Sequence, residues 1–164
     1  MRYTSEHKDT RLKILYLTLI LISLVTITVR LERYTGILSS VALIFLVAGL
    51  YLFIRFEMTS YTYIIESRDD KLELFIDRAV GKRGAYVCYY PVQYAREIIE
   101  HKKGSIKELR EKYKKLNVYK YYQNPFQKER VIIVFENEGY YDAVIIEKNE
   151  AFISYLKEAT KEQK

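Results

Sequence analysis

Two long apolar segments constrain this chain more than any other feature. Residues 12–29 read LKILYLTLILISLVTITV, interrupted only by Lys13, and residues 37–54 read ILSSVALIFLVAGLYLFI without any charge. A helix needs roughly 20 apolar residues, with a lower limit near 17, to cross a hydrocarbon core about 30 Å thick. The two segments are therefore predicted to be transmembrane helices. Residues 30–36 are predicted to be a tight turn that makes them an antiparallel hairpin.

This interpretation has two alternatives. The segments would also suit the core of a globular domain, but an apolar surface on all sides of a helix leaves no polar face for water. A cleaved signal peptide is disfavoured because no small-x-small cleavage site follows the first segment, and the second segment comes at once. Neither segment has an ionisable residue at depth, so a channel or transporter formed by this chain alone is not expected.

The charges beside the spans predict their orientation, because lysine and arginine concentrate on the cytoplasmic side. The turn offers Arg30 and Arg33, partly offset by Glu32. The basic residues before the first span are Arg2, Lys8, Arg11 and Lys13. We therefore expect a protein of the cell membrane that spans it twice, with both termini in the cytoplasm and residues 1–11 as a cytoplasmic tail.

Small residues in the second span predict close packing of the two helices, because small side chains let helix backbones approach. They are Ser39, Ser40, Ala42, Ala48 and Gly49. The same residues leave open an alternative function, in which the chain is an accessory subunit that docks into a larger membrane complex through its hairpin.

The rest of the chain is polar and nearly balanced in charge. Residues 56–164 contain twenty Lys/Arg and eighteen Asp/Glu, against seven and three in residues 1–55. The single cysteine, Cys88, cannot form an intramolecular disulfide, so this part is compatible with the cytosol. Cys88 lies in an apolar run and is expected to be a small buried hydrophobic residue.

Alternation of polar and apolar residues predicts short antiparallel strands in this polar part. The clearest is Lys71–Val80, which places Leu72, Leu74 and Ile76 on one face. The other predicted strands are Tyr61–Ser67, Ala85–Tyr90, Asn117–Gln123, Arg130–Glu136 and Tyr140–Lys148. Asn137–Gly139 is predicted to be a three-residue turn, while residues 92–101 are compatible with either a strand or a helix.

Two helices complete the predicted fold. Ser105–Leu116 has an apolar stripe and begins with the capping-box pair Ser105 and Glu108. The last helix has a stripe formed by Phe152, Tyr155, Leu156 and Ala159. The predicted fold class is α+β, with a transmembrane hairpin at 12–54 and an antiparallel sheet or partly open barrel at 58–160, capped by the C-terminal helix.

This order of elements resembles a family of bacterial two-span membrane proteins, found in clostridia and their relatives, that have a pleckstrin-homology-like domain. The resemblance rests on the strands in Tyr61–Pro91 and Val118–Lys148, on the spacing of Pro91 and Ile98, and on Phe152 and Leu156 after the closing strand. It implies a membrane-tethered cytoplasmic domain with that fold. It carries over no catalytic residue, and the lysine-rich helix before Leu116 departs from the plain fold.

Residues that could perform catalysis or hold a cofactor are scarce. His7 lies in the N-terminal tail and His101 in a basic stretch, so the sequence supports no Cys/His nucleophile pair, and no spacing of metal ligands is present. The glycines form no phosphate-binding fingerprint. Asp69 and Asp70 follow Arg68 and are best explained as a hairpin turn rather than a metal-binding pair. No enzymatic activity, metal or cofactor is therefore expected.

A cationic segment around the predicted helix Ser105–Leu116 is the candidate functional surface. We expect it to contact anionic groups through Lys102, Lys103, Lys107, Arg110, Lys112, Lys114 and Lys115. The expected partners are the lipid bilayer and a membrane protein or a second copy of the chain. A simple solvated helix face is the competing interpretation. Nucleic acid is not expected, because the polar part has only a small excess of positive charge.

Overall fold

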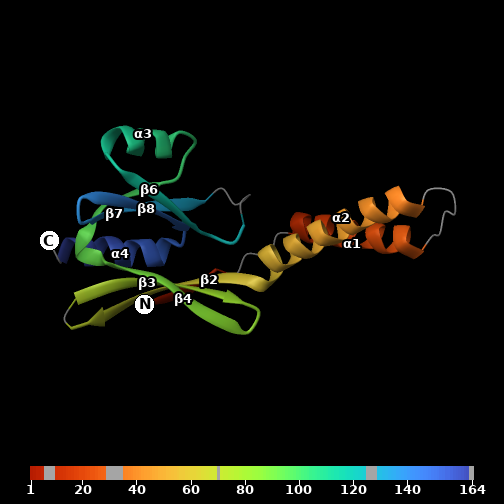
Figure 1. Ribbon diagram of the computed structural model, residues 1–164. Coiled ribbons are helices and arrows are strands. Elements are labelled where there is room, and N and C mark those ends of the chain that lie inside the picture. The colour runs from red at the N-terminus through yellow and green to blue at the C-terminus, as the bar shows by residue number, and fades with distance from the viewer. Residues whose placement is uncertain (6–9, 29–34, 70, 125–128, 163–164) are drawn as a thin grey trace. The chain divides into compact units, whose positions relative to one another are not determined.

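The computed structural model describes residues 1–5, 10–28, 35–69, 71–124 and 129–162, with only the backbone described at 35–38 and 162. The chain divides into two compact units (Figure 1). One unit is Glu6–Ser60, and the other joins Met1–Ser5 to Tyr61–Lys164. The chain therefore leaves the second unit after five residues and returns to it after the first unit.

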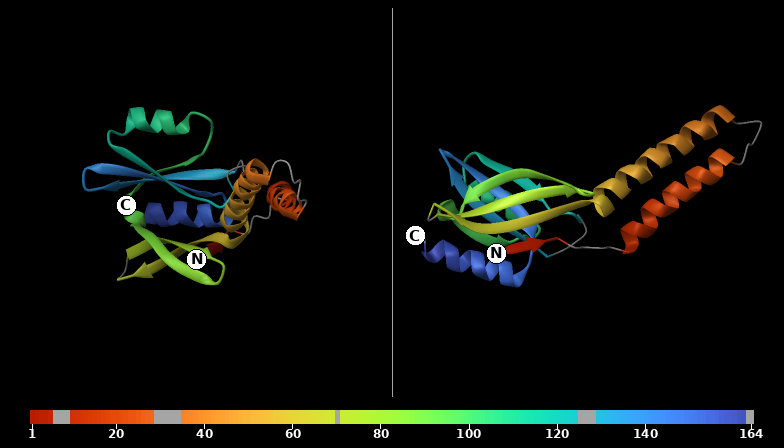
Figure 2. Two further views of the ribbon diagram at one scale, coloured as in Figure 1. Left: turned by 45° about the vertical axis from the view of Figure 1, so that its right-hand side comes forward. Right: turned by 90° about the horizontal axis from the view of Figure 1, so that it is seen from below.

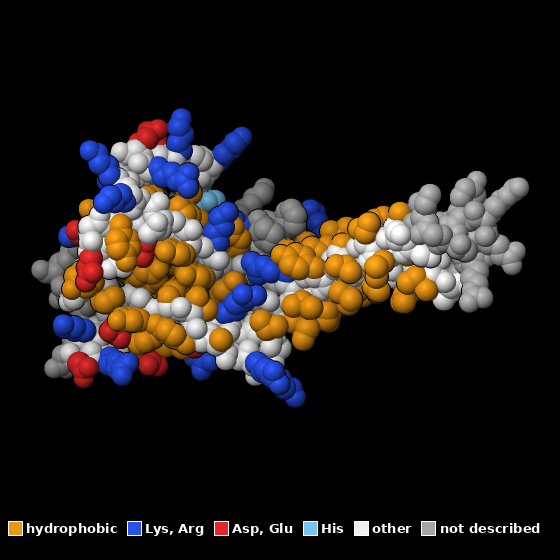
Figure 3. All heavy atoms as spheres, in the orientation of Figure 1, with side chains coloured by type: hydrophobic (Ala, Val, Ile, Leu, Met, Phe, Trp, Pro, Cys, Tyr) orange, Lys and Arg blue, Asp and Glu red, His pale blue; other side chains and the backbone are white. Residues whose placement is uncertain are grey.

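The first unit contains two long helices, α1 (Thr10–Thr28) and α2 (Thr35–Phe53), followed by a π-helix η1 (Ile54–Met58). The predicted apolar segments 12–29 and 37–54 are thus helical over their described residues, and both helices are long and apolar enough to cross a membrane. Hydrophobic side chains cover their visible surface (Figure 3). The predicted turn at 30–36 lies for the most part outside the described residues.

Small side chains hold α1 and α2 together. The hydroxyl of Ser23, which is fully buried, donates a hydrogen bond to the carbonyl oxygen of Ala42 at 2.8 Å. Gly49 faces α1 so closely that an added Cβ would lie 2.8 Å from Cγ1 of Ile20 and 3.3 Å from the carbonyl oxygen of Tyr16. Ala42 and Gly49 thus have the predicted role, whereas Ser39 and Ser40 are exposed.

Replacing Gly49 with leucine is expected to destabilise the helix pair. The new side chain would overlap Ile20 and the backbone of α1, and such overpacking costs about 1–3 kcal/mol. Thermal unfolding in mild detergent, followed by circular dichroism, measures the loss. Val47→Leu is the matched control because the side chain of Val47 is 60% exposed; equal melting temperatures for the two variants would contradict this packing.

The second unit begins with a strand, which corrects the prediction that residues 1–11 are only a tail. β1 (Arg2–Thr4) pairs antiparallel with β2 (Thr59–Arg68), with Tyr3 opposite Tyr63. The amide of Ser5 donates to the carbonyl oxygen of Tyr61 at 2.8 Å, and the amide of Ile65 donates to that of Met1 at 2.7 Å. The two helices are therefore inserted between two adjacent strands of one sheet.

Sheet one has the order β1-β2-β3-β4, where β3 is Lys71–Val80 and β4 is Arg83–Pro91. The predicted strands of this region are confirmed, and Leu74 and Ile76 are fully buried on the predicted apolar face. Cys88 is half-buried and packs against the core. The ambiguous residues after Pro91 form a short 3-10 helix η2 (Val92–Tyr94) and a strand β5 (Ala95–Glu100).

Sheet two has the order β5-β7-β8-β6. Its strands β7 (Arg130–Asn137) and β8 (Tyr140–Glu147) form an antiparallel hairpin. Its turn has two residues and not the predicted three, because Glu138 and Gly139, with φ of 35° and 91°, bring Asn137 opposite Tyr140. The expectation that all strands are antiparallel is wrong for β6 (Leu116–Tyr121), which runs parallel to β8.

The core lies between the two sheets, and α4 (Glu150–Glu162) closes one side of the gap between them (Figures 1 and 2). Phe152 and Leu156 are fully buried, and Ala159 is 3% exposed, as their stripe predicts. Tyr155 is 38% exposed, which corrects the prediction that it is buried. Ile153, at 5% exposed, takes part in the core instead.

The helix α3 (Ser105–Lys112) covers the outer face of sheet two and is one turn shorter than predicted. Its N-cap is Gly104, with φ of 99°, and the predicted capping box is absent. The hydroxyl of Ser105 instead accepts a hydrogen bond from the amide of Lys102 at 3.0 Å. The helix ends because Tyr113 is extended and its ring packs on that of Tyr141, with centroids 4.6 Å apart.

Candidate interaction surface on α3

The seven predicted contact residues lie in and beside α3, and all seven are exposed. Lys102 and Lys103 precede the helix, whereas Lys114 and Lys115 follow it. The helix itself contributes Lys107, Arg110 and Lys112. Lysine and arginine side chains accordingly gather over α3 in Figure 3, with few acidic side chains between them. We call these seven residues the cationic surface.

The packing of α3 directs these charges outward. Leu109 is 3% exposed and lies with Ile106 against a second apolar cluster on the outer face of β7 and β8. The residues of those strands in the cluster are Ile132, Val134, Ala143 and Ile145. Because one face of this eight-residue helix is buried, its lysines and arginine occupy the opposite face.

One member of the cationic surface is engaged within the domain. The ammonium of Lys112 lies 2.6 Å from a carboxylate oxygen of Glu97 on β5, and the hydroxyl of Tyr113 donates to the same oxygen at 3.0 Å. The hydrogen bond from Lys112 lowers the pKa of the Glu97 carboxyl. Lys112 therefore ties the end of α3 to sheet two, and its charge is largely neutralised.

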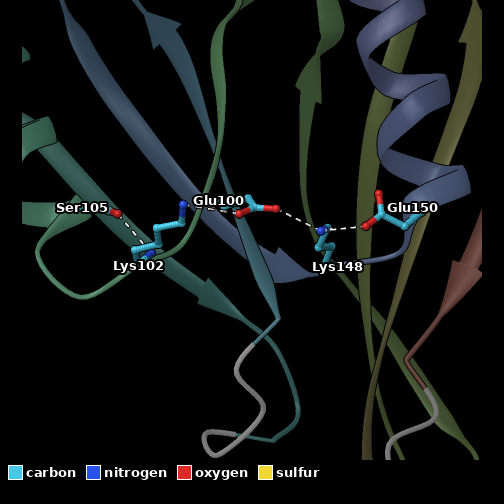
Figure 4. Close-up of polar contacts among 5 residues, drawn as sticks. All are labelled: Glu100, Lys102, Ser105, Lys148 and Glu150. Carbon is cyan, nitrogen blue, oxygen red and sulfur yellow. Dashed lines mark hydrogen bonds and ion pairs between the residues drawn. The ribbon is translucent and has the colours of Figure 1, made fainter.

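A chain of ion pairs lies beside the start of α3 (Figure 4). The ammonium of Lys148 contacts Glu150 at 2.6 Å and Glu100 at 2.9 Å, and hydrogen bonds to these two carboxylates raise its pKa. Lys102 lies 3.7 Å from the other oxygen of Glu100. These contacts link β5, the connection between β8 and α4, and α4 itself, and they leave Lys102 only a weak partner.

The remaining cations are free to act on something outside the chain. Lys107 and Glu111 are 4.0 Å apart and are 85% and 70% exposed, so this pair contributes little. Lys103, Arg110, Lys114 and Lys115 have no acidic partner within ion-pair distance among the residues that the structure describes. Burial lowers the pKa of the nearby His101, and the charge of Arg130 adds to this effect.

The structure also shows an aromatic surface that sequence analysis did not identify. Tyr86 and Tyr89 of β4 are 56% and 52% exposed, and both rings lie beside that of Phe75 on β3. The sequence did contain a signal, because AYVCYY has more apolar residues than one face of a strand can bury. An apolar surplus of this kind indicates a second, exposed apolar face.

The described residues contain no group of three or more histidine, cysteine or acidic side chains arranged to hold a metal ion. Asp69 is a turn residue with φ of 51°, and its neighbour Asp70 lies outside the described residues. Comparison of the chain with models of protein families, with curated proteins and with solved structures finds no match. The function is therefore argued from the chain's own residues.

Proposed function

We propose that this chain is a two-span membrane protein whose pleckstrin-homology-like cytoplasmic domain binds anionic lipid headgroups through the cationic surface, without catalysis. The observation that carries the proposal is the insertion of the two apolar helices between β1 and β2. Five residues separate β1 from α1, a reach of at most about 18 Å, and β2 begins directly after η1. The domain is thus tethered at two points.

Exposure of the helices supports the membrane spans. Leu21, Ile44 and Val47 are 63%, 64% and 60% exposed, and only 17% and 11% of the two apolar segments are buried. A core helix of a soluble protein would be mostly buried, so these surfaces need an apolar environment such as lipid. Cleavage of α1 as a signal peptide would also remove β1 from its sheet.

The pairing of β1 with β2 supports an even number of crossings. Two strands can share hydrogen bonds only if they lie on the same side of the membrane, and one crossing by the inserted segment would separate them. The basic residues before α1 favour the cytoplasm for that side. Both termini are accordingly assigned to the cytoplasm.

The strand order supports the pleckstrin-homology-like fold. Apart from the inserted α3 and β6, the strands of both sheets are antiparallel, and the chain closes with α4 after the last strand. Except for β1, which precedes the two spans, this is the order of elements that the resemblance implies. The fold supplies a small domain whose outer faces are available for binding, which fits an interaction module.

Four cations remain for lipid contact once Lys102, Lys107 and Lys112, each of which has an acidic side chain nearby, are set aside. Each lysine or arginine near an anionic leaflet contributes about 1 kcal/mol, and the effect decays over roughly 8 Å at physiological salt. Because the tether holds the domain close to the bilayer, Lys103, Arg110, Lys114 and Lys115 gain this energy without the cost of bringing a free protein to the surface.

Reversing these four charges to glutamate is expected to release the cationic surface from anionic membranes, with a loss of up to about 4 kcal/mol. The full chain would be reconstituted in vesicles, with Cys88→Ser and a fluorophore at Glu108→Cys on α3. Energy transfer to a headgroup-labelled lipid measures proximity. We expect stronger transfer with phosphatidylserine than with phosphatidylcholine alone, and no such difference for the four-residue variant.

A charge-matched control separates this contact from a general effect of net charge. It carries four reversals at exposed positions outside α3, namely Lys71, Lys82, Arg83 and Lys157. The control is expected to keep the preference for phosphatidylserine. Equal transfer in both kinds of vesicle for the parent chain would refute the lipid function, as would the same loss in the control.

The alternative is an accessory subunit that docks through the hairpin. Of the small residues that suggest it, Ala42 and Gly49 are buried in the contact between α1 and α2, whereas Ser39 and Ser40 are exposed. For nucleic-acid binding, two tyrosines of this region are engaged by other side chains: Tyr113 packs on Tyr141, and the guanidinium of Arg130 lies 3.9 Å from the centre of the Tyr122 ring.

A further inference from the structure

The outer face of sheet one carries a continuous aromatic surface. Phe75 on β3 lies between two tyrosines of β4, with ring centroids 6.1 Å from Tyr89 and 6.4 Å from Tyr86. The rings of Phe75 and Tyr89 are nearly parallel, at 27°. More than half of each tyrosine is exposed, so the pair is presented to a partner and does not belong to the core.

A β-bulge places both tyrosines on this face. Residues 86 and 89 are three apart and would point to opposite faces of a regular strand. The register shifts between Ile76 and Asp77, so that Tyr89 pairs with Phe75 and Tyr86 pairs with Asp77. Because residues 75 and 77 share one face of β3, their partners share it too. Bulges commonly redirect side chains at functional surfaces.

Three adjoining hollows extend from this surface. The first, of about 580 Å³, lies between the rings and the turn that joins β2 to β3. The second, of about 290 Å³, shares Tyr89 with the first and reaches Tyr94. The third shares Tyr94 and ends at the turn between β7 and β8. We call this path the tyrosine groove, defined by Phe75, Tyr86, Tyr89 and Tyr94.

The tyrosine groove is acidic although the chain as a whole has a net charge of +6. Its basic lining residues are Arg68 and Arg96, and Arg96 is neutralised by an ion pair with Glu136. Its acidic lining residues are Asp69, Glu73, Glu136 and Glu138. Partial desolvation raises the pKa of Tyr86, and the carboxylates of Glu73 and Asp77 add to this effect.

We propose that the tyrosine groove binds an arginine- and lysine-rich segment of another membrane protein in extended form. Tyrosine faces attract guanidinium and ammonium groups, and the carboxylates complement their charge. Membrane proteins carry such basic segments beside their spans on the cytoplasmic side. The choice of partner rests on the proposed membrane anchor. The groove uses none of the cationic surface, and the strands β3 and β4, which carry Phe75, Tyr86 and Tyr89, lie on the far side of the domain from α3 (Figure 1).

The test uses the full chain in a neutral detergent and a fluorescent octapeptide of alternating arginine and glycine. Fluorescence anisotropy is expected to show binding that weakens about tenfold in the variant Tyr86→Ala, Tyr89→Ala, as the loss of two cation–π contacts implies. The matched control is Tyr119→Ala, Tyr155→Ala, which removes two tyrosines that are each 38% exposed and lie outside the groove. It should bind as the parent does.

A second variant tests the contribution of the carboxylates separately, and it remains informative if the tyrosine variant does not fold. Glu73→Gln with Glu138→Gln leaves the rings in place and is expected to weaken binding of the arginine peptide. A glutamate peptide of equal length should not bind. Thermal melting of every variant checks the fold. This assay contains no lipid. A lack of peptide binding would therefore contradict the proposed role of the groove without bearing on lipid binding by the cationic surface.

The proposal is overturned if the arginine peptide does not bind the parent chain, or if its affinity for the tyrosine variant and the glutamine variant equals its affinity for the parent. It is also overturned if the glutamate peptide binds the parent as tightly as the arginine peptide does. Sedimentation of the chain without peptide tests whether a second copy of this chain occupies the groove. Self-association that both groove variants abolish would mean that a second copy of this chain fills the groove, and would overturn the assignment to a foreign partner.

Discussion

Replacing Phe152 with alanine is expected to destabilise the domain formed by the two sheets and α4 by about 3–5 kcal/mol. The side chain is fully buried where α4 closes the core, and its ring lies 6.1 Å from that of Tyr63 and 6.3 Å from that of Tyr3. Alanine would leave a cavity between β1, β2 and α4. Domains have a total stability of about 5–15 kcal/mol, so the loss is a large part of it.

The matched control for this prediction is Tyr155→Ala, on the same helix but 38% exposed. A surface change of this kind is expected to stay within about 0.5 kcal/mol. Urea unfolding of the full chain in detergent, followed by the near-ultraviolet circular dichroism of tyrosine, measures both variants. If Tyr155→Ala costs as much as Phe152→Ala, the placement of α4 in this structure is wrong.

The contrast between Phe152 and Tyr155 shows how far periodicity predicts a helix face. The stripe correctly identified Phe152, Leu156 and Ala159, because residues three and four apart share a face. It could not decide which residue at the margin is buried, since Tyr155 and Ile153 flank the stripe on opposite sides. That choice depends on where the two sheets lie, which the helix sequence does not contain.

Strand pairing was predictable only where it is local. The hairpins of β3 with β4 and of β7 with β8 follow from alternation and short turns. The parallel pairing of β6 with β8 does not, because the paired residues are 25 positions apart: Asn117 lies opposite Asp142, and its side-chain amide donates to Asp142 at 3.0 Å. β1 was missed because a strand of three residues is too short to show a period.

The exposure of the cationic surface could be predicted from the sequence, but the ion pairs of its residues could not. Polar residues opposite Leu109 had to face outward, whatever the helix packed against. The acidic partners of Lys112 and Lys102 are Glu97 and Glu100, both on β5, whose structure the sequence left undecided. The apolar surplus of AYVCYY indicates an exposed apolar face on β4, but the tyrosine groove could not be predicted from it, because the bulge that places Tyr86 and Tyr89 on one face has no sequence signature.

The sharpest test of the membrane topology follows from β1. Arg2 and Lys157 are exposed residues of one domain, so cysteines placed there are expected to lie on the same side of the membrane. A cysteine at Glu32, between α1 and α2 in the sequence, is expected on the opposite side. Each would be introduced singly into the Cys88→Ser chain and labelled with a membrane-impermeant maleimide on intact cells.

We expect Glu32→Cys to react with the external reagent, and Arg2→Cys and Lys157→Cys to react only after the membrane is opened. The difference should be close to all or none, because a charged reagent does not cross the hydrocarbon core. Opposite accessibility for Arg2→Cys and Lys157→Cys would contradict the pairing of β1 with β2. Protection of all three cysteines would mean that α1 and α2 do not cross the membrane, and the two-point tether that the proposed function needs would be lost with it.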